Sequence, residues 1–371
     1  MKNVVDIFIE IVKIPSISLK EKKMADYLFD ELRKLGLEVF EDGSKKIFKG
    51  NCGNIIAIFK GNKEGEPIFF SSHIDTVEPG INIQPVKGKK YVKSFGDTIL
   101  GADDKAGVAA MIDVARRIKE ENIKSPRIEF IFTVAEEIGL LGGKHLDTSF
   151  IKSKYGYVLD SEGPVGKIII NAPSQDSIKA NFTGISAHAG VCPEKGINAI
   201  QAASIAISKM KLGRIDEETT ANIGLISGGQ AINIVPEKVN IQGEARSLSE
   251  SKLDKQVNNM IKCIKEGAEI SGGKAEYKIE RLYNCYSLDK GSKTVKIALE
   301  ALKRKSITPH IESTGGGSDT NIYNEKGLEA LNLGMGAIDV HTKRERLSIE
   351  ELKKLSDLCV EIVKVNAEYN D

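Results

Sequence analysis

The feature that most constrains the fold is a series of short, almost continuously apolar segments separated by helix-like patterns. The segments lie at residues 54–59, 68–72, 127–134 and 156–159, and apolar residues recur with a helical period over residues 105–120. Strands that are apolar on both faces lie within a sheet that helices cover on both sides. This part of the chain is therefore predicted to form an α/β domain with a largely buried sheet.

The pattern changes after Pro173, where apolar and polar side chains begin to alternate as in strands with one exposed face. The expected elements are a strand at 176–184, a helix at 198–210, strands at 221–226 and 239–245, a helix at 250–268 and a strand at 275–283. This βαββαβ order is that of a small ferredoxin-like domain. The first pattern resumes at Gly291. We therefore expect a discontinuous larger domain, residues 1–175 and 287–371, with residues 176–286 inserted into it.

Composition argues against several classes of protein. The 371 residues are enough for two domains. The 53 Lys and Arg residues balance the 52 Asp and Glu residues without a basic stripe, which argues against nucleic-acid binding. No apolar run approaches the ~20 residues of a membrane helix, so no membrane partner is expected. The five cysteines are scattered and never form a C-x-x-C pair, which argues against a disulfide framework or a thiolate metal site and favours a cytoplasmic protein.

Residues able to bind metal ions stand where the predicted strands end. In open α/β sheets, functional sites lie at the carboxyl ends of the strands. His73 closes one apolar segment, and Asp75 follows two residues later, where a carboxylate could accept a hydrogen bond from the second ring nitrogen of a metal-binding imidazole. A hydrogen-bonded loop explains the H-x-D pair on its own at least as well.

Carboxylates also come in adjacent pairs. Asp103 and Asp104 open the predicted helix at 105–120, where one carboxylate would suffice as a cap. Glu136 and Glu137 follow an apolar strand directly. Because adjacent side chains point in different directions, one glutamate could bind a metal while the other acts as a general base.

Two single residues complete the candidate ligands. Asp160 ends the fourth apolar segment and His341 stands near the C-terminus, and each alone is more simply explained as structural. Together, two histidines and three or four carboxylates form a mixed nitrogen and oxygen ligand set that suits zinc, manganese or cobalt. Their number suffices for two metal ions that share one carboxylate, as in the two-metal sites of aminopeptidases.

Five motifs, in the same order, resemble those of the M20 family of metallopeptidases. They are SSHIDT at 71–76, GADDKAG at 101–107, AEEIGLLG at 135–142, the strand-end Asp160 and the late His341. The second motif and the surroundings of His341 are most similar to the peptidase T (tripeptide aminopeptidase) branch. The resemblance covers essentially the whole chain. It implies a zinc-exopeptidase-like catalytic domain, with a central mixed sheet flanked by helices, and an inserted lid or dimerisation domain.

The resemblance also implies a role for each of these residues. Two divalent metal ions, zinc in the first place with manganese or cobalt as alternatives, would be bound by His73, Asp103, Glu137, Asp160 and His341. Asp103 would bridge the two ions, and Asp104 would be a neighbour. Glu136 would be the general base that takes a proton from the attacking water and returns it to the leaving amine. Asp75 would orient His73.

The inserted domain carries further candidates. GISAHAG at 184–190 resembles a motif of the family whose histidine, His188 here, would reach the active site, often from the partner subunit of a dimer, and help to stabilise the oxyanion of the reaction. Asn233 and Arg246 match positions that hold the carboxylate of the substrate. The planar guanidinium of Arg suits that task because it binds a carboxylate with two hydrogen bonds. A homodimer formed through the inserted domain is therefore expected.

Three functions remain open on the sequence. The first is an exopeptidase that removes the N-terminal residue from tripeptides or similar short peptides. The second is an N-acyl-amino-acid amidohydrolase or carboxypeptidase-like enzyme of the same family. It stays open because Ser161-Glu162-Gly163 follows the strand-end Asp where tripeptidases of the family typically have a glycine-rich continuation. The third, a non-catalytic metal- or ligand-binding protein, is disfavoured because Glu136 stands beside the expected ligands.

Overall fold

The computed structural model describes residues 2–369, which divide into two compact units. Unit 1 comprises residues 2–170, 287–313 and 318–369, and unit 2 comprises residues 171–286 and 314–317. The first strand of unit 2, β9 (Ser174–Thr183), starts two residues before the predicted boundary. It does so because only Pro173 separates it from the preceding strand, β8 (Lys167–Ala172).

Unit 1 is built on a mixed sheet with parallel strands at its centre. Its other strands are β1 (Glu38–Glu41), β2 (Ile55–Phe59), β3 (Ile68–His73), β6 (Ile128–Thr133), β7 (Tyr155–Ser161), β14 (Tyr286–Ser287), β15 (His310–Ser313) and β16 (Glu329–Gly334). The order is β1-β2-β6-β3-β7-β16-β8-β14, with β15 paired to β8. β6, β3, β7 and β16 run parallel, and β2 and β8 pair antiparallel on either side. Every residue of β3 and β6 is buried, as expected for strands covered on both faces.

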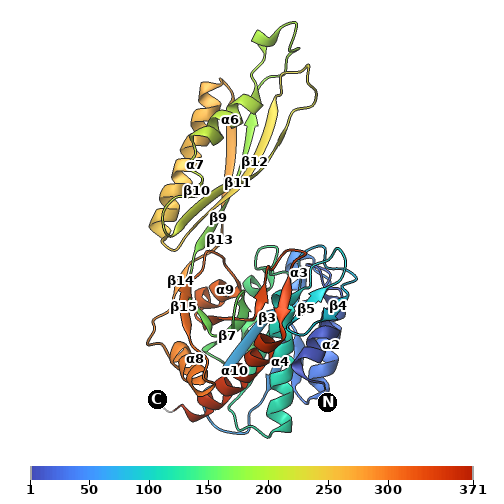
Figure 1. The fold of residues 1–371 in the computed structure, drawn as a ribbon. Coiled ribbons are helices and arrows are strands. Elements are labelled where there is room, and N and C mark those ends of the chain that lie inside the picture. The colour runs from blue at the N-terminus through green and yellow to red at the C-terminus, as the bar shows by residue number, and fades with distance from the viewer. Residues whose placement is uncertain (1, 370–371) are drawn as a thin grey trace. The chain divides into compact units, whose positions relative to one another are not determined.

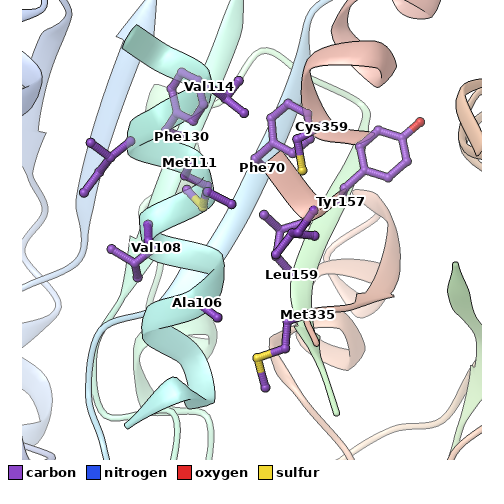
Figure 2. Packing of buried hydrophobic residues seen from close by; sticks show 14 of the residues in the cluster. Phe70, Ala106, Val108, Met111, Val114, Phe130, Tyr157, Leu159, Met335 and Cys359 are labelled. Carbon is purple, nitrogen blue, oxygen red and sulfur yellow. The ribbon is translucent and has the colours of Figure 1, made fainter. Parts of the chain in front are cut away.

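Helices cover both faces of this sheet. They include α1 (Val4–Ile11), α2 (Lys22–Lys34), α4 (Ala102–Glu120), α8 (Lys293–Arg304), α9 (Asp319–Glu325) and α10 (Ile349–Glu368). Successive residues of β3 point to opposite faces: Phe70 joins the cluster under α4 and α10, and Phe69 joins a smaller one with Tyr323 of α9. Figure 2 shows Phe70 between α4 and Tyr157, with ring centroids 5.7 Å apart. Truncation of Phe70 to alanine would cost about 3–5 kcal/mol.

A second, four-stranded sheet lies in the same unit. Its strands are β4 (Pro85–Lys87), β5 (Tyr91–Ser94), β17 (Ala337–Ile338) and β18 (Arg346–Ser348), in the order β17-β18-β5-β4. Three short helices complete the unit: α3 (Lys45–Phe48), α5 (Leu141–Lys144) and the 3₁₀ helix η1 (Thr148–Phe150). The sequence did not predict this sheet, because strands of two to four residues are too short for a periodic pattern. It holds the two ends of the loop 339–345, which carries His341.

Unit 2 is a five-stranded antiparallel sheet with two helices on one face (Figure 1). Its other elements are β10 (Gly213–Arg214), β11 (Thr219–Gly228), β12 (Lys238–Ser247), β13 (Lys274–Tyr283), α6 (Ala199–Lys209), α7 (Glu250–Ile270) and the 3₁₀ helix η2 (Pro193–Lys195). The strand order is β10-β11-β12-β9-β13. Apart from the two-residue β10, the chain order β9-α6-β11-β12-α7-β13 is the expected βαββαβ order. The unit has a hydrophobic core of its own between the sheet and the two helices.

The central mixed sheet flanked by helices, predicted for the larger part of the chain, is thus confirmed. None of the helices within residues 2–369 combines the length and the apolar character that crossing a bilayer requires.

Candidate metal centre

The carboxyl ends of adjacent parallel strands bring predicted site residues to one edge of the unit 1 sheet. His73 is the last residue of β3, and Asp160 is the sixth of the seven residues of β7. Glu136 and Glu137 follow the end of β6 at Thr133. Because β6, β3 and β7 are neighbours in the sheet, side chains that are far apart in the sequence meet at this edge.

The start of α4 supplies two further carboxylates. Asp103 and Asp104 have non-helical backbone angles, the peptide bond between them is cis, and the regular helix begins at Lys105. A Cβ atom at Gly107 would lie 2.1 Å from Ser72 Oγ. Only glycine therefore lets the start of the helix approach the end of β3 so closely.

The buried imidazole of His73 faces a different group with each nitrogen. Nδ1 lies 3.0 Å from the carbonyl oxygen of Asp75, so the proton of the neutral ring is assigned to Nδ1 and the lone pair to Nε2. Nε2 lies 3.1 Å from Oδ1 of Asp103 and 3.6 Å from Oδ1 of Asp160. A lone pair and two carboxylates repel one another at these distances, and a proton or a metal cation between them would remove the repulsion.

The second histidine approaches the same carboxylate from the other side. Nε2 of His341 lies 3.1 Å from Oδ2 of Asp103 and 3.0 Å from Oε1 of Glu137. Asp103 thus presents one oxygen to each imidazole. Its carboxylate stands between His73 and His341, which is the arrangement a bridging ligand requires.

Two overlapping groups have ligand atoms within 4.8 Å of one another: His73 with Asp104 and Asp160, and His73 with Asp103 and Glu137. Oδ2 of Asp104 is buried and makes no hydrogen bond to any group of the described residues. Such an oxygen is expected where a ligand supplies the missing partner. Asp104, expected only as a neighbour, is therefore a candidate ligand as well.

The electrostatics of the cluster fit divalent cations. Burial raises the pKa of Asp160 to about 7 and raises the pKa of Glu137. Burial lowers the pKa of His73, but the carboxylates of Asp103 and Asp160 outweigh it and raise that pKa well above its ordinary value. Contacts with Asp103 and Glu137 raise the pKa of His341 to about 10. Bound protons therefore compensate the excess of carboxylates in the free protein, and metal ions would take over that role on binding.

Asp75 has two tasks in the structure. Its carbonyl oxygen is the nearest group to Nδ1 of His73, and its carboxylate Oδ1 is 3.4 Å from the same nitrogen. The carboxylate also accepts hydrogen bonds from the backbone N–H groups of Glu136 (3.0 Å) and Glu137 (3.3 Å). Asp75 therefore holds the imidazole and the glutamate loop in one fixed relation.

The predicted substrate-binding residues all lie in unit 2, at two different places. His188 and Asn233 are exposed on adjoining loops, where the Ala189 N–H donates to the carbonyl oxygen of Asn233 (2.9 Å). Arg246 lies near the far end of β12 and donates two hydrogen bonds to Glu244 (3.0 and 2.9 Å). From Lys238 to Arg246 the strand advances eight residues, about 26 Å at roughly 3.3 Å per residue. Within one copy of unit 2, the loop and the arginine are therefore far apart.

Two residues near the cluster were missed from the sequence. The hydroxyl of Ser18 donates to Oδ2 of Asp75 (2.6 Å), and the carboxylate of Glu345 accepts backbone N–H groups just before and at Asp103. Ser18 is one of two serines in a short loop of mixed polarity, and Glu345 stands in the charged run 343–346, which on sequence alone indicates solvated surface. Their partners are 57 and about 240 residues away, so no local pattern could mark them.

Comparison with known proteins identifies the family. The model of peptidase family M20/M25/M40 matches residues 69–365. The uncharacterized protein YqjE of Bacillus subtilis (strain 168) is 46% identical over 363 residues, which are 98% of either chain. The crystal structure of aminopeptidase PepT from Bacillus cereus ATCC 10987 is similar with a TM-score of 0.90 at 43% identity, over 98% of both chains. That of a tripeptidase from Staphylococcus aureus subsp. aureus Mu50 has a TM-score of 0.95 at 39% identity, over 99% of this chain and 98% of the other.

These matches confirm the resemblance seen in the motifs, including its peptidase T character. The cluster of imidazoles and carboxylates at the sheet edge provides candidate metal ligands within that family. The chain therefore belongs to peptidase family M20/M25/M40 and is a metallopeptidase.

Proposed function

We propose that this metallopeptidase is a two-metal exopeptidase that releases the N-terminal residue of tripeptides and similar short peptides. The observation that carries the proposal is the carboxylate of Asp103, which presents Oδ1 to His73 and Oδ2 to His341 at 3.1 Å each. A carboxylate shared in this way can join two metal ions into one site. The substrate class follows from the similarity to the B. cereus aminopeptidase and the S. aureus tripeptidase.

Two ligand sets share Asp103 in this proposal. His73 and Asp160 would hold one ion, and His341 and Glu137 the other. The mixture of nitrogen and oxygen ligands suits zinc, with manganese and cobalt as alternatives. Divalent ions bound there would supply Lewis-acid polarisation of a carbonyl group and would make a water molecule more acidic.

Glu136 would act as the proton carrier of the reaction. Its carboxyl group is buried, and its backbone N–H is anchored on Asp75 Oδ1 at 3.0 Å, so the side chain starts from a fixed position at the sheet edge. Burial raises its pKa well above the ordinary value for Glu. A carboxylate in this position can accept the proton of the attacking water and then donate it to the leaving amine.

The substrate-binding residues support a homodimer. If Arg246 and the loop of His188 and Asn233 act on the same short peptide, they come from different subunits, because about 26 Å separates them within one sheet. The outer side of strand β11 in unit 2 offers an edge for such an association. Among the described residues, β10 pairs only with Thr220 and Ala221 of β11, and farther along the strand Leu225 and Ile226 are 62% and 53% exposed. Strand edges with exposed apolar side chains readily pair with another copy of the chain.

A cytoplasmic location accords with the cysteines. All five are free thiols, and three of them are buried. Unpaired thiols are typical of reducing compartments.

Metal analysis combined with a small peptide panel tests the proposal. Protein purified from a metal-controlled medium should bind two divalent ions per chain. It should cleave a free tripeptide at its first peptide bond and leave the N-acetylated form of the same peptide intact. A preference for the acetylated peptide would instead establish an N-acyl-amino-acid amidohydrolase. Absence of cleavage of any di- or tripeptide with zinc, manganese or cobalt present would refute peptide hydrolysis.

A further inference from the structure

The buried carboxylate of Glu345 accepts every backbone N–H group of the four-residue segment that ends at Asp103. Oε2 of Glu345 accepts the N–H groups of Leu100 and Gly101 (2.7 Å each), and Oε1 accepts those of Ala102 (2.8 Å) and Asp103 (3.1 Å). Glu345 is 2% exposed. Hydrogen bonds to an ionised carboxylate are about twice as strong as neutral ones, so four on one group hold the backbone firmly.

The same residue belongs to the loop that carries His341. Glu345 lies four residues after His341, in the loop between β17 and β18. This loop is braced internally: the Glu345 N–H donates to Thr342 O (3.0 Å), and the Thr342 hydroxyl donates to Asp339 O (2.8 Å). Glu345 thus ties the segment of one proposed ligand, Asp103, to the segment of another, His341.

We propose that Glu345 is a positioning residue that holds Asp103 and His341 at the separation needed for the second metal ion. This inference rests on the proposed function, since it takes Asp103, Glu137 and His341 as ligands. His73 is placed independently of Glu345, because it ends strand β3 and is held by Asp75. Loss of the Glu345 carboxylate should therefore weaken the ion at His341 more than the ion at His73.

Glutamine at this position is a sharp test because it keeps the size of the side chain. Its amide group has one acceptor oxygen and an NH₂ group that can only donate. At least two of the four N–H groups would then face a donor or lose their partner. Aspartate keeps the charge but is one methylene shorter. It therefore tests whether the carboxylate must reach the N–H groups of residues 100–103.

Glu129 offers a matched control in the same unit. Its carboxylate is fully buried and accepts the N–H groups of Lys152 (2.8 Å) and Ser153 (3.1 Å) and the Ser153 hydroxyl (2.6 Å). It lies at the start of β6, away from the carboxyl end where Glu136 follows. Glu129→Gln removes a comparable buried carboxylate without touching the ligand segments.

The experiment compares Glu345→Gln, Glu345→Asp and Glu129→Gln with the wild-type holoenzyme. The two Co²⁺ dissociation constants are measured by titration with the visible spectrum as readout, and kcat and KM are measured as functions of free Zn²⁺. Loss of a hydrogen bond behind a metal ligand typically weakens metal binding 10–100-fold. In both Glu345 variants we expect about that loss for the second ion, and a smaller loss for the first ion because Asp103 is shared. Their kcat should fall and recover with excess Zn²⁺, with KM nearly unchanged, and the Glu129 variant should lose only thermal stability.

The outcomes separate an error in the two-metal site from an error in the positioning role of Glu345. If wild-type protein binds no second ion, the two-metal site and the role of Glu345 are both wrong. If it does, and if Glu345→Gln binds both ions as tightly as Glu129→Gln does, only the positioning role is wrong. Should the glutamine variant fail to fold, the same criterion applies to Glu345→Asp, and its failure to fold as well would mark Glu345 as structural and overturn the inference.

Discussion

The candidate residues of unit 1 converge on one point, whereas those of unit 2 are spread over the length of a sheet. In unit 1, Asp103 approaches two imidazoles at 3.1 Å. In unit 2, His188 and Arg246 stand toward opposite ends of an antiparallel sheet. The strand direction explains the difference. Parallel strands place all their carboxyl ends at one end of the sheet, whereas the strands of an antiparallel sheet alternate in direction and so distribute their loops between both ends.

This comparison indicates what each unit can do alone. In the proposed function, the cluster in unit 1 would bind the metal ions and carry out proton transfer with residues of a single chain. The candidate residues of unit 2 would act on one short substrate only if a second copy supplied one of the two groups. Four predictions test this contrast.

The largest effect is expected from Glu136→Ala. Loss of the general base should lower kcat by roughly 10⁴-fold, at the upper end for such groups. The bound metal should stay at the wild-type level, because Glu136 is not among the proposed ligands. Metal content by mass spectrometry and steady-state kinetics on a tripeptide measure both quantities. Unchanged turnover would contradict the assigned role.

His188→Ala should lower kcat by about 10²–10³-fold, as loss of one donor to the developing oxyanion does. Metal content and oligomeric state should not change, and His310→Ala, which removes an exposed histidine of β15, serves as the control. Mixing the His188→Ala and Glu136→Ala proteins should restore about a quarter of the wild-type activity. Half of the dimers would then be mixed and have one complete site. If no activity returns, His188 acts within its own chain.

Removal of the metal ions should destabilise unit 1 and leave unit 2 unchanged. At a free metal concentration 100 times the Kd, binding stabilises the folded state by about 2.7 kcal/mol. Hydrogen exchange with and without chelator should therefore show faster exchange for the amides of α4 and β3 only. Equal acceleration in β12 would show that the two units unfold together.

The smallest effect is expected from Arg246→Lys. Lysine keeps the charge but loses the planar fork that binds a carboxylate with two hydrogen bonds. KM for a free tripeptide should rise about tenfold, the equivalent of one charge-assisted hydrogen bond, with little change in kcat. Arg281→Lys alters another arginine of unit 2 that pairs with a carboxylate, Asp176, and should leave KM unchanged.

Much of unit 1 could be predicted because its strands are buried on both faces. The apolar segments at 68–72 and 127–134 correspond to β3 and β6, and the polar residues after them stand where site residues of parallel sheets are expected. The β4, β5, β17 and β18 sheet was not predicted, because its strands are too short to show a period. Glu345 was missed for a related reason. On the sequence its charge indicates a solvated side chain. Only in the folded chain do the distant N–H groups of residues 100–103 lie next to its carboxylate.

The amino-acid sequence by itself determined the types of chemical group and the elements that carry them. Hydrophobic periodicity and the residues at strand ends are local properties, and local properties can be read in order along a chain. Only the tertiary structure decided that Asp103 faces both histidines, that Asp75 holds the glutamate loop, and that His188 and Arg246 lie toward opposite ends of one sheet. These are distances between residues far apart in the chain, and they arise only when strand order and helix packing fix them in space.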